Sequence, residues 1–454
     1  MNSLLRLLPF EEYMLLDDHP AYPMCCFINI KLQGRFDVAV FTSALRETLS
    51  YHPLLISLVT ETKKRYHWRR AETMPVVARQ PLEFERSFPR SQGIDLLSEP
   101  ALKITVCNTN TNPAETHLEG QTNVCFEVHH SATDAAGIVR FIEDTLCCYV
   151  QKTGFTEIQR ANVEPELLIK RGHYRHSIFR TLPKQLWGIF RAWKFLMNRV
   201  VPLPPKKLVD RQKPPEEYPT ILCRELTEAE TQRIQQNAKQ LGITLNDWFL
   251  CASFLAMKKW REQHITDKSA ADKSTADKKR GNLRIAVPMN LRTAADERMP
   301  AANVVSMVFI DRKPEKIRAS QTFYQGIRRE MRHIKRCDLG WAFIFGLTLY
   351  RLVFGNFRKM MLPDQCWTTA TVSNLGRLFA DTPLPVRAGR VQIGDSLEII
   401  GVEAVPPVRP STAIGISVLT YADCLTINLH YDSAVLTRSD ALSMLTDMLK
   451  ERHT

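Results

Sequence analysis

Two adjacent histidines and a following acid, His129, His130 and Asp134, form the pattern in this sequence with the clearest capacity for chemistry. An imidazole has a pKa near neutral pH, so one that points into a site can take a proton from an attacking hydroxyl or amine. Acyl transfer requires a base of this kind, and we interpret His130 as that general base. His129 would support it, and Asp134 would brace the turn by pairing with a cation elsewhere. The alternative is that both histidines are hydrogen-bonded polar residues at a turn.

The elements on either side of this pattern favour the catalytic interpretation. Residues 123–128 have the character of a strand and lead directly into His129. Residues 135–149 predict an amphipathic helix, because their apolar side chains recur on one side, namely Ile138, Phe141, Ile142, Leu146 and Tyr149. The motif therefore lies at a strand-to-helix turn, where side chains are exposed at the edge of a sheet.

These histidines do not indicate a metal site. Adjacent residues of a strand point to opposite faces, and no other cluster of ligands accompanies them in the sequence. The 11 cysteines include the adjacent pairs Cys25–Cys26 and Cys147–Cys148 and no Cys-x-x-Cys motif. Thiols within apolar segments behave as small hydrophobic groups. We therefore expect free cysteines in a reducing, cytoplasmic setting.

Length and composition favour two lobes of ordinary globular character. The chain has 454 residues, 44% of them hydrophobic and 24% charged, and is longer than one hydrophobic core usually supports. The apolar N-terminus is interrupted by Arg6 and Pro9, so we expect no signal peptide or anchor there. No apolar run reaches the roughly 18 residues of a membrane span. We expect a protein that is soluble or peripheral to a membrane.

The net charge of +13 is concentrated in one stretch. Residues 167–213 contain twelve Lys or Arg and one acid, Asp210, which gives 12 − 1 = +11 of the total. The rest of the chain is close to neutral, which argues against a nucleic-acid surface. Within the stretch, residues 186–200 predict a basic amphipathic helix that either packs its apolar side onto the body or contacts an anionic membrane.

The chain divides by pattern into three parts. Residues 1–165 form an N-terminal lobe with the histidine motif, residues 166–215 a basic crossover, and residues 216–454 a C-terminal lobe. In the last part we predict strands at 283–287, 304–310, 370–372, 413–418 and 425–431, and helices at 228–241, 245–259 and 438–450. Residues 264–281 are low in complexity and predict a disordered loop. Residues 341–354 are unusually apolar and predict a helix that is either buried or in contact with lipid or an acyl chain.

The segment His129-His130-Ser131-Ala132-Thr133-Asp134-Ala135 resembles the His-His-x-x-x-Asp-Gly motif of one acyltransferase superfamily. That superfamily includes chloramphenicol acetyltransferases, nonribosomal peptide synthetase condensation domains, plant-type acyltransferases, alcohol acetyltransferases and wax ester synthases. Residues 288–292, Pro-Met-Asn-Leu-Arg, are similar to the Asn-x-Arg motif of its second lobe. Residues 372–376, Val-Ser-Asn-Leu-Gly, are similar to the Ser-Asn-x-Gly turn of alcohol acetyltransferases, the members closest in motif. The order and spacing of elements extend the resemblance over nearly the whole chain.

The resemblance implies an α/β fold of two chloramphenicol acetyltransferase-like lobes, each a mixed sheet flanked by helices, with the active-site tunnel between them. It implies that His130 is the base and that Asp134 is a structural acid bound to Arg292. One entrance would take a thioester of coenzyme A or of the phosphopantetheine of an acyl-carrier protein, and the other an alcohol or amine. No metal or permanently bound cofactor is expected. Ser373 and Asn374 would donate hydrogen bonds to the oxyanion, although a turn that closes at Gly376 explains them equally well.

Two departures from the family pattern bear on function. Ala135 replaces the glycine that follows the acid, and residues 51–56 stand where condensation domains carry an arginine-rich segment. The second departure favours a free-standing transferase over a peptide-synthetase domain. The leading hypothesis is therefore an acyltransferase. The alternatives are a condensation-type protein, a catalytically idle relative that binds a carrier protein or another partner, and a peripheral membrane protein.

We predict that deletion of residues 264–281 leaves thioester turnover unchanged. A small, charged segment of this composition cannot bury enough apolar surface to offset the entropy of ordering it. Release of free thiol from acyl-coenzyme A measures turnover. A deletion variant that folds but has lost turnover would show that this segment covers the site.

Overall fold

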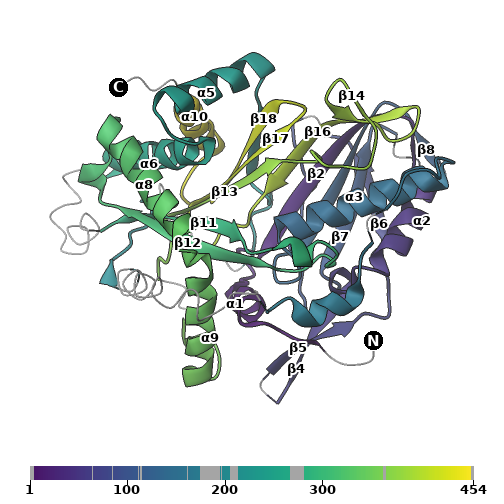
Figure 1. Ribbon diagram of the computed structural model, residues 1–454, viewed down its shortest axis with the longest axis horizontal. Helices are drawn as coiled ribbons and strands as arrows, with labels where there is room; N and C mark the ends of the chain where they lie inside the picture. The colour runs from purple at the N-terminus through teal and green to yellow at the C-terminus, as the bar shows by residue number, and fades with distance from the viewer. Residues whose placement is uncertain are drawn as a thin grey trace.

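The computed structural model describes residues 5–63, 65–83, 85–110, 112, 115–160, 162–173, 195, 197–204, 213–265, 281–360 and 365–450. Most of the loop predicted at 264–281 and most of the basic helix predicted at 186–200 lie outside these residues. The described chain forms two lobes, each built on one sheet with helices against it (Figure 1). This arrangement confirms the mixed α/β fold class.

The first sheet has five strands in the order β16-β2-β9-β7-β6. They are Leu397–Val405 (β16), Cys25–Gly34 (β2), Gln121–His129 (β9), Leu102–Asn108 (β7) and Val77–Pro81 (β6). Neighbouring strands are antiparallel except β6 and β7, which are parallel. Helices α2 (Val38–Leu49) and α3 (Ala135–Lys152) enclose a core with this sheet that includes Phe41, Phe126 and Phe141.

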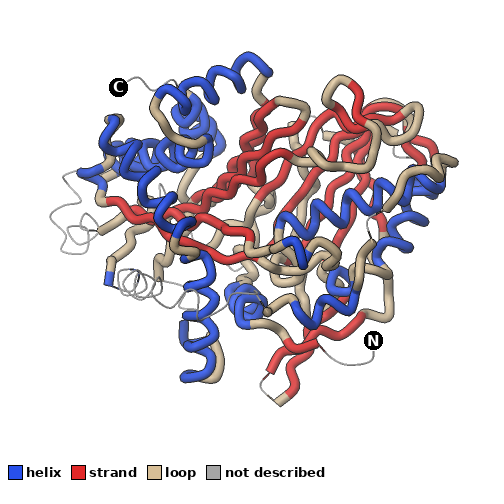
Figure 2. The backbone as a smooth tube through the Cα atoms, viewed as in Figure 1, coloured by secondary structure: helices blue, strands red, loops and turns tan. Residues whose placement is uncertain are grey.

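The second sheet has six strands in the order β10-β18-β17-β13-β11-β12. They are Ile221–Glu225 (β10), Cys424–Tyr431 (β18), Ile414–Tyr421 (β17), Ala370–Arg377 (β13), Leu283–Asn290 (β11) and Val305–Arg312 (β12). Strand β13 runs parallel to both neighbours, and the other pairs are antiparallel. Each strand predicted in this half of the sequence is present. Helices gather beside this sheet in Figure 2, namely α5 (Glu228–Gln240), α6 (Leu245–His264), α8 (Gln321–Arg336) and α10 (Arg438–Leu449).

Strand β16 brings the C-terminal half of the chain into the first sheet. It pairs with β2 from Leu397 opposite Gly34 to Val405 opposite Phe27. Gly34 has a φ of +123°, and a Cβ on it would lie 1.8 Å from the Ser396 carbonyl oxygen, so glycine is required where the two strands meet. The sequence pattern assigns residues 216–454 to the second lobe and does not mark this strand. A strand from the C-terminal half of the chain therefore completes the sheet of the first lobe.

Helix α1 (Pro9–Asp17) lies between the lobes and is held by buried ion pairs. Glu11 accepts from Arg171 Nε at 2.7 Å and from the indole nitrogen of Trp68 at 3.0 Å. Glu12 pairs with Arg351 of the C-terminal half at 2.7 Å. Short strands complete the fold in three small sheets: β1 (Leu5–Arg6), β5 (Arg65–Arg70) and β4 (Ser57–Thr62); β3 (Phe36–Asp37) and β8 (His117–Leu118); and β14 (Val386–Arg387) and β15 (Arg390–Val391).

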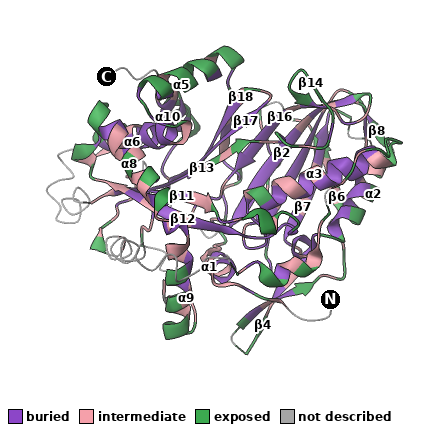
Figure 3. Ribbon diagram, viewed as in Figure 1, coloured by how far each residue is buried: buried purple, intermediate pink, exposed green. Residues whose placement is uncertain are grey.

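Residues 342–354 form the helix α9 (Ala342–Phe354), which projects from the body beside α1 (Figure 1). Of the two alternatives left by the sequence, a fully buried helix is wrong, because only Ile344 and Leu347 are buried. Its outer part carries the colour of exposed residues in Figure 3. In the described residues no single helix is long and apolar enough to cross a membrane. Residues 321–336 and 339–354 are long and apolar enough only when they are taken together, and the two segments are bent by 86° relative to each other.

Candidate active site

The turn between β9 and α3 holds His130 by its backbone and by its ring. The His130 N–H donates to the Met24 carbonyl at 2.8 Å, and ring Nδ1 lies 3.0 Å from the Thr133 carbonyl oxygen. A carbonyl oxygen can only accept, so Nδ1 carries the proton and Nε2 is left with its lone pair. Burial lowers the pKa of His130, while the Thr133 hydrogen bond opposes this. The ring is therefore held neutral and in one tautomer, which is the form a general base needs.

Asp134 caps α3 and binds three separate donors. Its Oδ1 accepts the Gly137 N–H at 2.9 Å, and its Oδ2 accepts the Val304 N–H at 2.8 Å and Arg292 Nη1 at 2.7 Å. The sequence proposed Arg292 as the partner of this acid, and the structure places the two in contact. Both carboxylate oxygens are therefore occupied, and Asp134 connects the histidine turn to the second lobe.

Residues 301–304 form a strap across the histidine turn. The Ala302 carbonyl accepts from the Asp134 N–H at 3.3 Å and from Arg292 Nη2 at 2.8 Å. Asn303 Nδ2 donates to the His130 carbonyl at 2.7 Å. Sequence reasoning missed Asn303, because an asparagine just before a strand carries no signal of its own. The strap connects the second lobe directly to the backbone of the base.

His52 anchors the beginning of this strap. Its Nδ1 accepts the Ala301 N–H at 2.9 Å, and its Nε2 lies 3.0 Å from Asp144 Oδ2 on α3. With Nδ1 accepting, Nε2 carries the proton and donates to Asp144. Burial lowers the pKa of His52, which favours this neutral form. The sequence does not single out His52, since its partners are distant in the chain.

His129 does not line the cavity, and its ring forms a hydrogen bond within the turn. Its side chain is fully buried, Nδ1 accepts the Ser131 N–H at 3.2 Å, and Nε2 lies 3.7 Å from Asp18 Oδ2. The supporting role of His129 stays a prediction, and these contacts show where its ring lies. The two histidines thus lie on opposite sides of the strand end, as adjacent strand residues must.

The glycine requirement of the turn falls at Gly137. A Cβ on Gly137 would lie 2.2 Å from Thr133 Oγ1 and 3.0 Å from the Ala302 carbonyl oxygen. Ala135, which replaces the family glycine, is the first residue of α3 and is half-exposed. The turn therefore tolerates a side chain at 135 and excludes one at 137.

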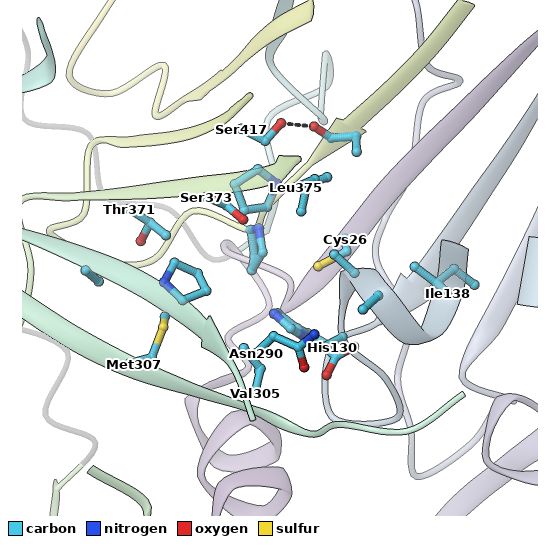
Figure 4. Close-up of a pocket in the computed structure, with 18 of the residues that line it drawn as sticks. Cys26, His130, Ile138, Asn290, Val305, Met307, Thr371, Ser373, Leu375 and Ser417 are labelled. Carbon is cyan, nitrogen blue, oxygen red and sulfur yellow. Dashed lines mark hydrogen bonds between the residues drawn. The ribbon is translucent and has the colours of Figure 1, made fainter. Parts of the chain in front are cut away.

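A cavity of about 530 Å³ extends between the lobes from His130 (Figure 4). Its polar lining combines His130 and Asp134 of the first lobe with Asn290, Ser373 and Asn374, which lie on strands β11 and β13 of the second sheet. Elsewhere its wall is mostly apolar and includes the aromatic side chains Phe10, Tyr13, Phe195, Phe309, Phe343 and Trp367. The apolar wall suits a hydrocarbon or aromatic group, and the polar part lies beside the base.

A buried ion pair interrupts the apolar wall. Arg409 binds Asp17 of α1, and its guanidinium lies 5.8 Å from the Tyr13 ring centroid. Burial disfavours charge on Arg409, but the Asp17 carboxylate and the neighbouring Tyr13 together oppose this, and the pKa of the guanidinium is raised. Both residues line the cavity. The pair therefore presents fixed charges to whatever occupies the apolar region.

Ser373 and Asn374 lie in the middle of β13, on the lobe opposite His130, and Figure 4 shows Ser373. Asn374 Oδ1 accepts the Gly376 N–H at 2.9 Å, and Gly376 has a φ of +70°. The pairing with β17 shifts register here, between Asn374 and Gly376. Asn374 thus closes its own turn, while its amide nitrogen and the Ser373 hydroxyl remain candidate donors. Among the described residues no group of three or more His, Cys, Asp or Glu is placed to hold a metal ion.

Solved structures share this architecture over essentially the whole chain. The first condensation domain of the calcium-dependent antibiotic synthetase superposes with a TM-score of 0.65 at 13% identity, covering 100% of this chain and 98% of that one. The chain has the condensation-domain fold. The same fold is found in trichothecene 15-O-acetyltransferase from Fusarium sporotrichioides, with a TM-score of 0.68 at 12% identity and coverage of 99% and 95%.

A third structure with the condensation-domain fold is the starter condensation domain of rhizomide synthetase, solved with C8-coenzyme A and a leucine thioester analogue. It superposes with a TM-score of 0.65 at 12% identity and covers 99% of this chain and 93% of that one. No family model and no curated protein matches the sequence. At these identities the likeness establishes the fold, and the chemistry must be argued from the residues of this chain.

We predict that Asp134→Asn lowers the free energy of unfolding by about 3 kcal/mol, because it leaves the Arg292 guanidinium without its charge partner in a mostly buried position. Urea denaturation measures the change. Glu47→Gln is the matched control, since Glu47 forms ion pairs with Lys152 and Arg160 near the surface, and it should cost about 0.5 kcal/mol. Equal losses in the two variants would show that the Asp134 brace is no stronger than a surface pair.

Proposed function

We propose that the protein is an acyltransferase that moves an acyl group from a thioester to an alcohol or amine. The observation that carries this proposal is the neutral His130 ring, locked in one tautomer, with a lone pair on Nε2 beside an inter-lobe cavity. The donor would be acyl-coenzyme A or an acyl group on the phosphopantetheine of a carrier protein. The mostly apolar cavity favours an acyl group or acceptor that is itself apolar.

Each step of the proposed reaction can be assigned to residues of the site. His130 Nε2 takes the proton as the hydroxyl or amine attacks the thioester carbonyl carbon, and a tetrahedral oxyanion forms. The Ser373 hydroxyl and the Asn374 amide are the donors proposed for that oxyanion. When the carbon–sulfur bond breaks, the departing thiolate takes the proton from the His130 imidazolium. The new ester or amide and the free thiol then leave the cavity.

The condensation reaction of peptide synthesis is the second candidate. Solved condensation domains share the fold, and a carrier-bound amine is a nucleophile that the same base could serve. Incubation with a panel of acyl-coenzyme A thioesters, followed by thiol release with and without alcohols or amines, tests the first candidate. Turnover only with carrier-bound substrates would favour the second.

We predict that His130→Ala lowers the rate of acyl transfer at least about 100-fold, because a positioned general base contributes that much or more. Far-UV circular dichroism and the melting temperature check that the variant is folded. His117→Ala is the control, because His117 lies at the surface on β8 and should leave the rate unchanged. Equal rates in the His130 variant and the parent would refute the proposed mechanism.

The pH dependence of kcat/KM gives an independent test. Burial lowers the pKa of His130 below its ordinary value of 6.5, so the neutral base persists in more acidic solution than a free imidazole would. We predict that the acidic limb of the profile falls below pH 6.5, with a plateau above it. An acidic limb above pH 6.5 would mean that another group limits the rate.

A further inference from the structure

The outer face of α9 is the largest concentration of exposed apolar side chains in the described part of the chain. Of thirteen exposed large hydrophobic residues, five lie on this one helix: Phe345, Leu349, Leu352, Val353 and Phe354. The first four follow the i, i+4, i+7, i+8 spacing of a single helical face. Leu352 is 79% exposed and Val353 is 66% exposed. A contiguous patch of this kind marks an interaction surface.

The opposite side of α9 packs against the body of the protein, and its contacts determine which face of the helix is exposed. Ile344 and Leu347 are buried, and Arg351 forms its ion pair with Glu12 beneath the helix. Phe343 meets the Phe10 ring of α1 edge-on, with centroids 5.8 Å apart. The helix cannot turn its apolar face inward without breaking these contacts.

Cations lie on the chain segments next to the helix. Arg6, Arg65 and Arg358 are all exposed, and Arg358 donates to the Tyr66 hydroxyl at 2.9 Å. Arg351 Nη1 donates to the carbonyl of Leu7, the residue after Arg6, at 3.4 Å, and β1 pairs with β5, the strand that begins at Arg65. Glu61, 3.4 Å from Arg358, is the exposed acid of this group. The apolar face is therefore accompanied by net positive charge.

We propose that α9 docks onto an anionic lipid surface, with its apolar face among the acyl chains and the arginines near the headgroups. An apolar face with cations beside it is the composition that binds helices to such surfaces. A second copy of this chain fits less well, because it would bring the same arginines face to face. One helix of 13 residues also offers little of the roughly 800 Å² per partner that a stable dimer buries.

The position of α9 connects this surface to the cavity. Phe343 at the start of the helix and Met360 shortly after it both line the apolar region. An apolar substrate held in the lipid would therefore lie close to the wall of the cavity that accepts it. This consequence rests on the proposed acyl transfer, whereas the docking itself does not.

Sedimentation with lipid vesicles tests the docking without any substrate. Vesicles of neutral phosphatidylcholine, and others containing about 30% phosphatidylglycerol to supply negative surface charge, are mixed with the full chain at low and high salt. The test variant is Leu349→Gln with Leu352→Gln and Val353→Gln, since glutamine keeps helix propensity. The matched control is Val76→Gln with Leu97→Gln and Leu442→Gln, three exposed apolar residues away from α9. Circular dichroism and melting temperature confirm that both variants fold.

We expect the parent and the control variant to bind the anionic vesicles, with weaker binding at high salt. The α9 variant should lose at least about tenfold in partition coefficient, because three apolar side chains are removed from the lipid. His130→Ala should bind as the parent does, which separates this result from any failure of the proposed function. Equal binding by the α9 variant, no binding by the parent, or self-association that depends on α9 without vesicle binding would each overturn the proposal.

Discussion

The Asp134 carboxylate is the interaction on which the site depends. It joins the first turn of α3 to a distant stretch of the chain, through the Val304 N–H of the strap and the guanidinium of Arg292. A buried carboxylate is costly unless its oxygens are paired, and here each oxygen has a donor. The same strap binds the His130 carbonyl through Asn303. The contacts of Asp134 with Val304 and Arg292 therefore also help to hold the backbone of His130 in place.

The lobes are held together around that point by contacts that combine both halves of the chain. Strand β16 completes the first sheet, and Glu403 within it pairs with Lys31 of β2 at 2.6 Å. The cavity takes polar residues from both lobes and part of its aromatic lining from α1, β12 and α9. A site built across two lobes in this way can change its volume through side chains that do not touch the base.

Helix α1 shows how charge is used inside an otherwise apolar interface. Glu11, Glu12 and Asp17 pair with Arg171, Arg351 and Arg409, each from a different part of the chain. Such pairs add little net stability, because desolvation offsets much of their attraction, but breaking one leaves an unpaired buried charge. We infer that these pairs fix where α1 lies, and with it the cavity wall formed by Phe10 and Tyr13.

The sequence by itself determined the local features, because periodicity and motif spacing are local signals. These features are the strand-to-helix turn with its histidines and acid, and the positions of most strands along the chain. The sequence also paired Arg292 with Asp134, but only through resemblance to a known family. Tertiary structure alone decided what depends on distant contacts. Strand β16 joins the first sheet, Asn303 and His52 hold the turn, and α9 exposes its apolar face. An apolar segment has the same sequence pattern whether it is buried or exposed. Whether it is buried depends on the distant residues that pack against it.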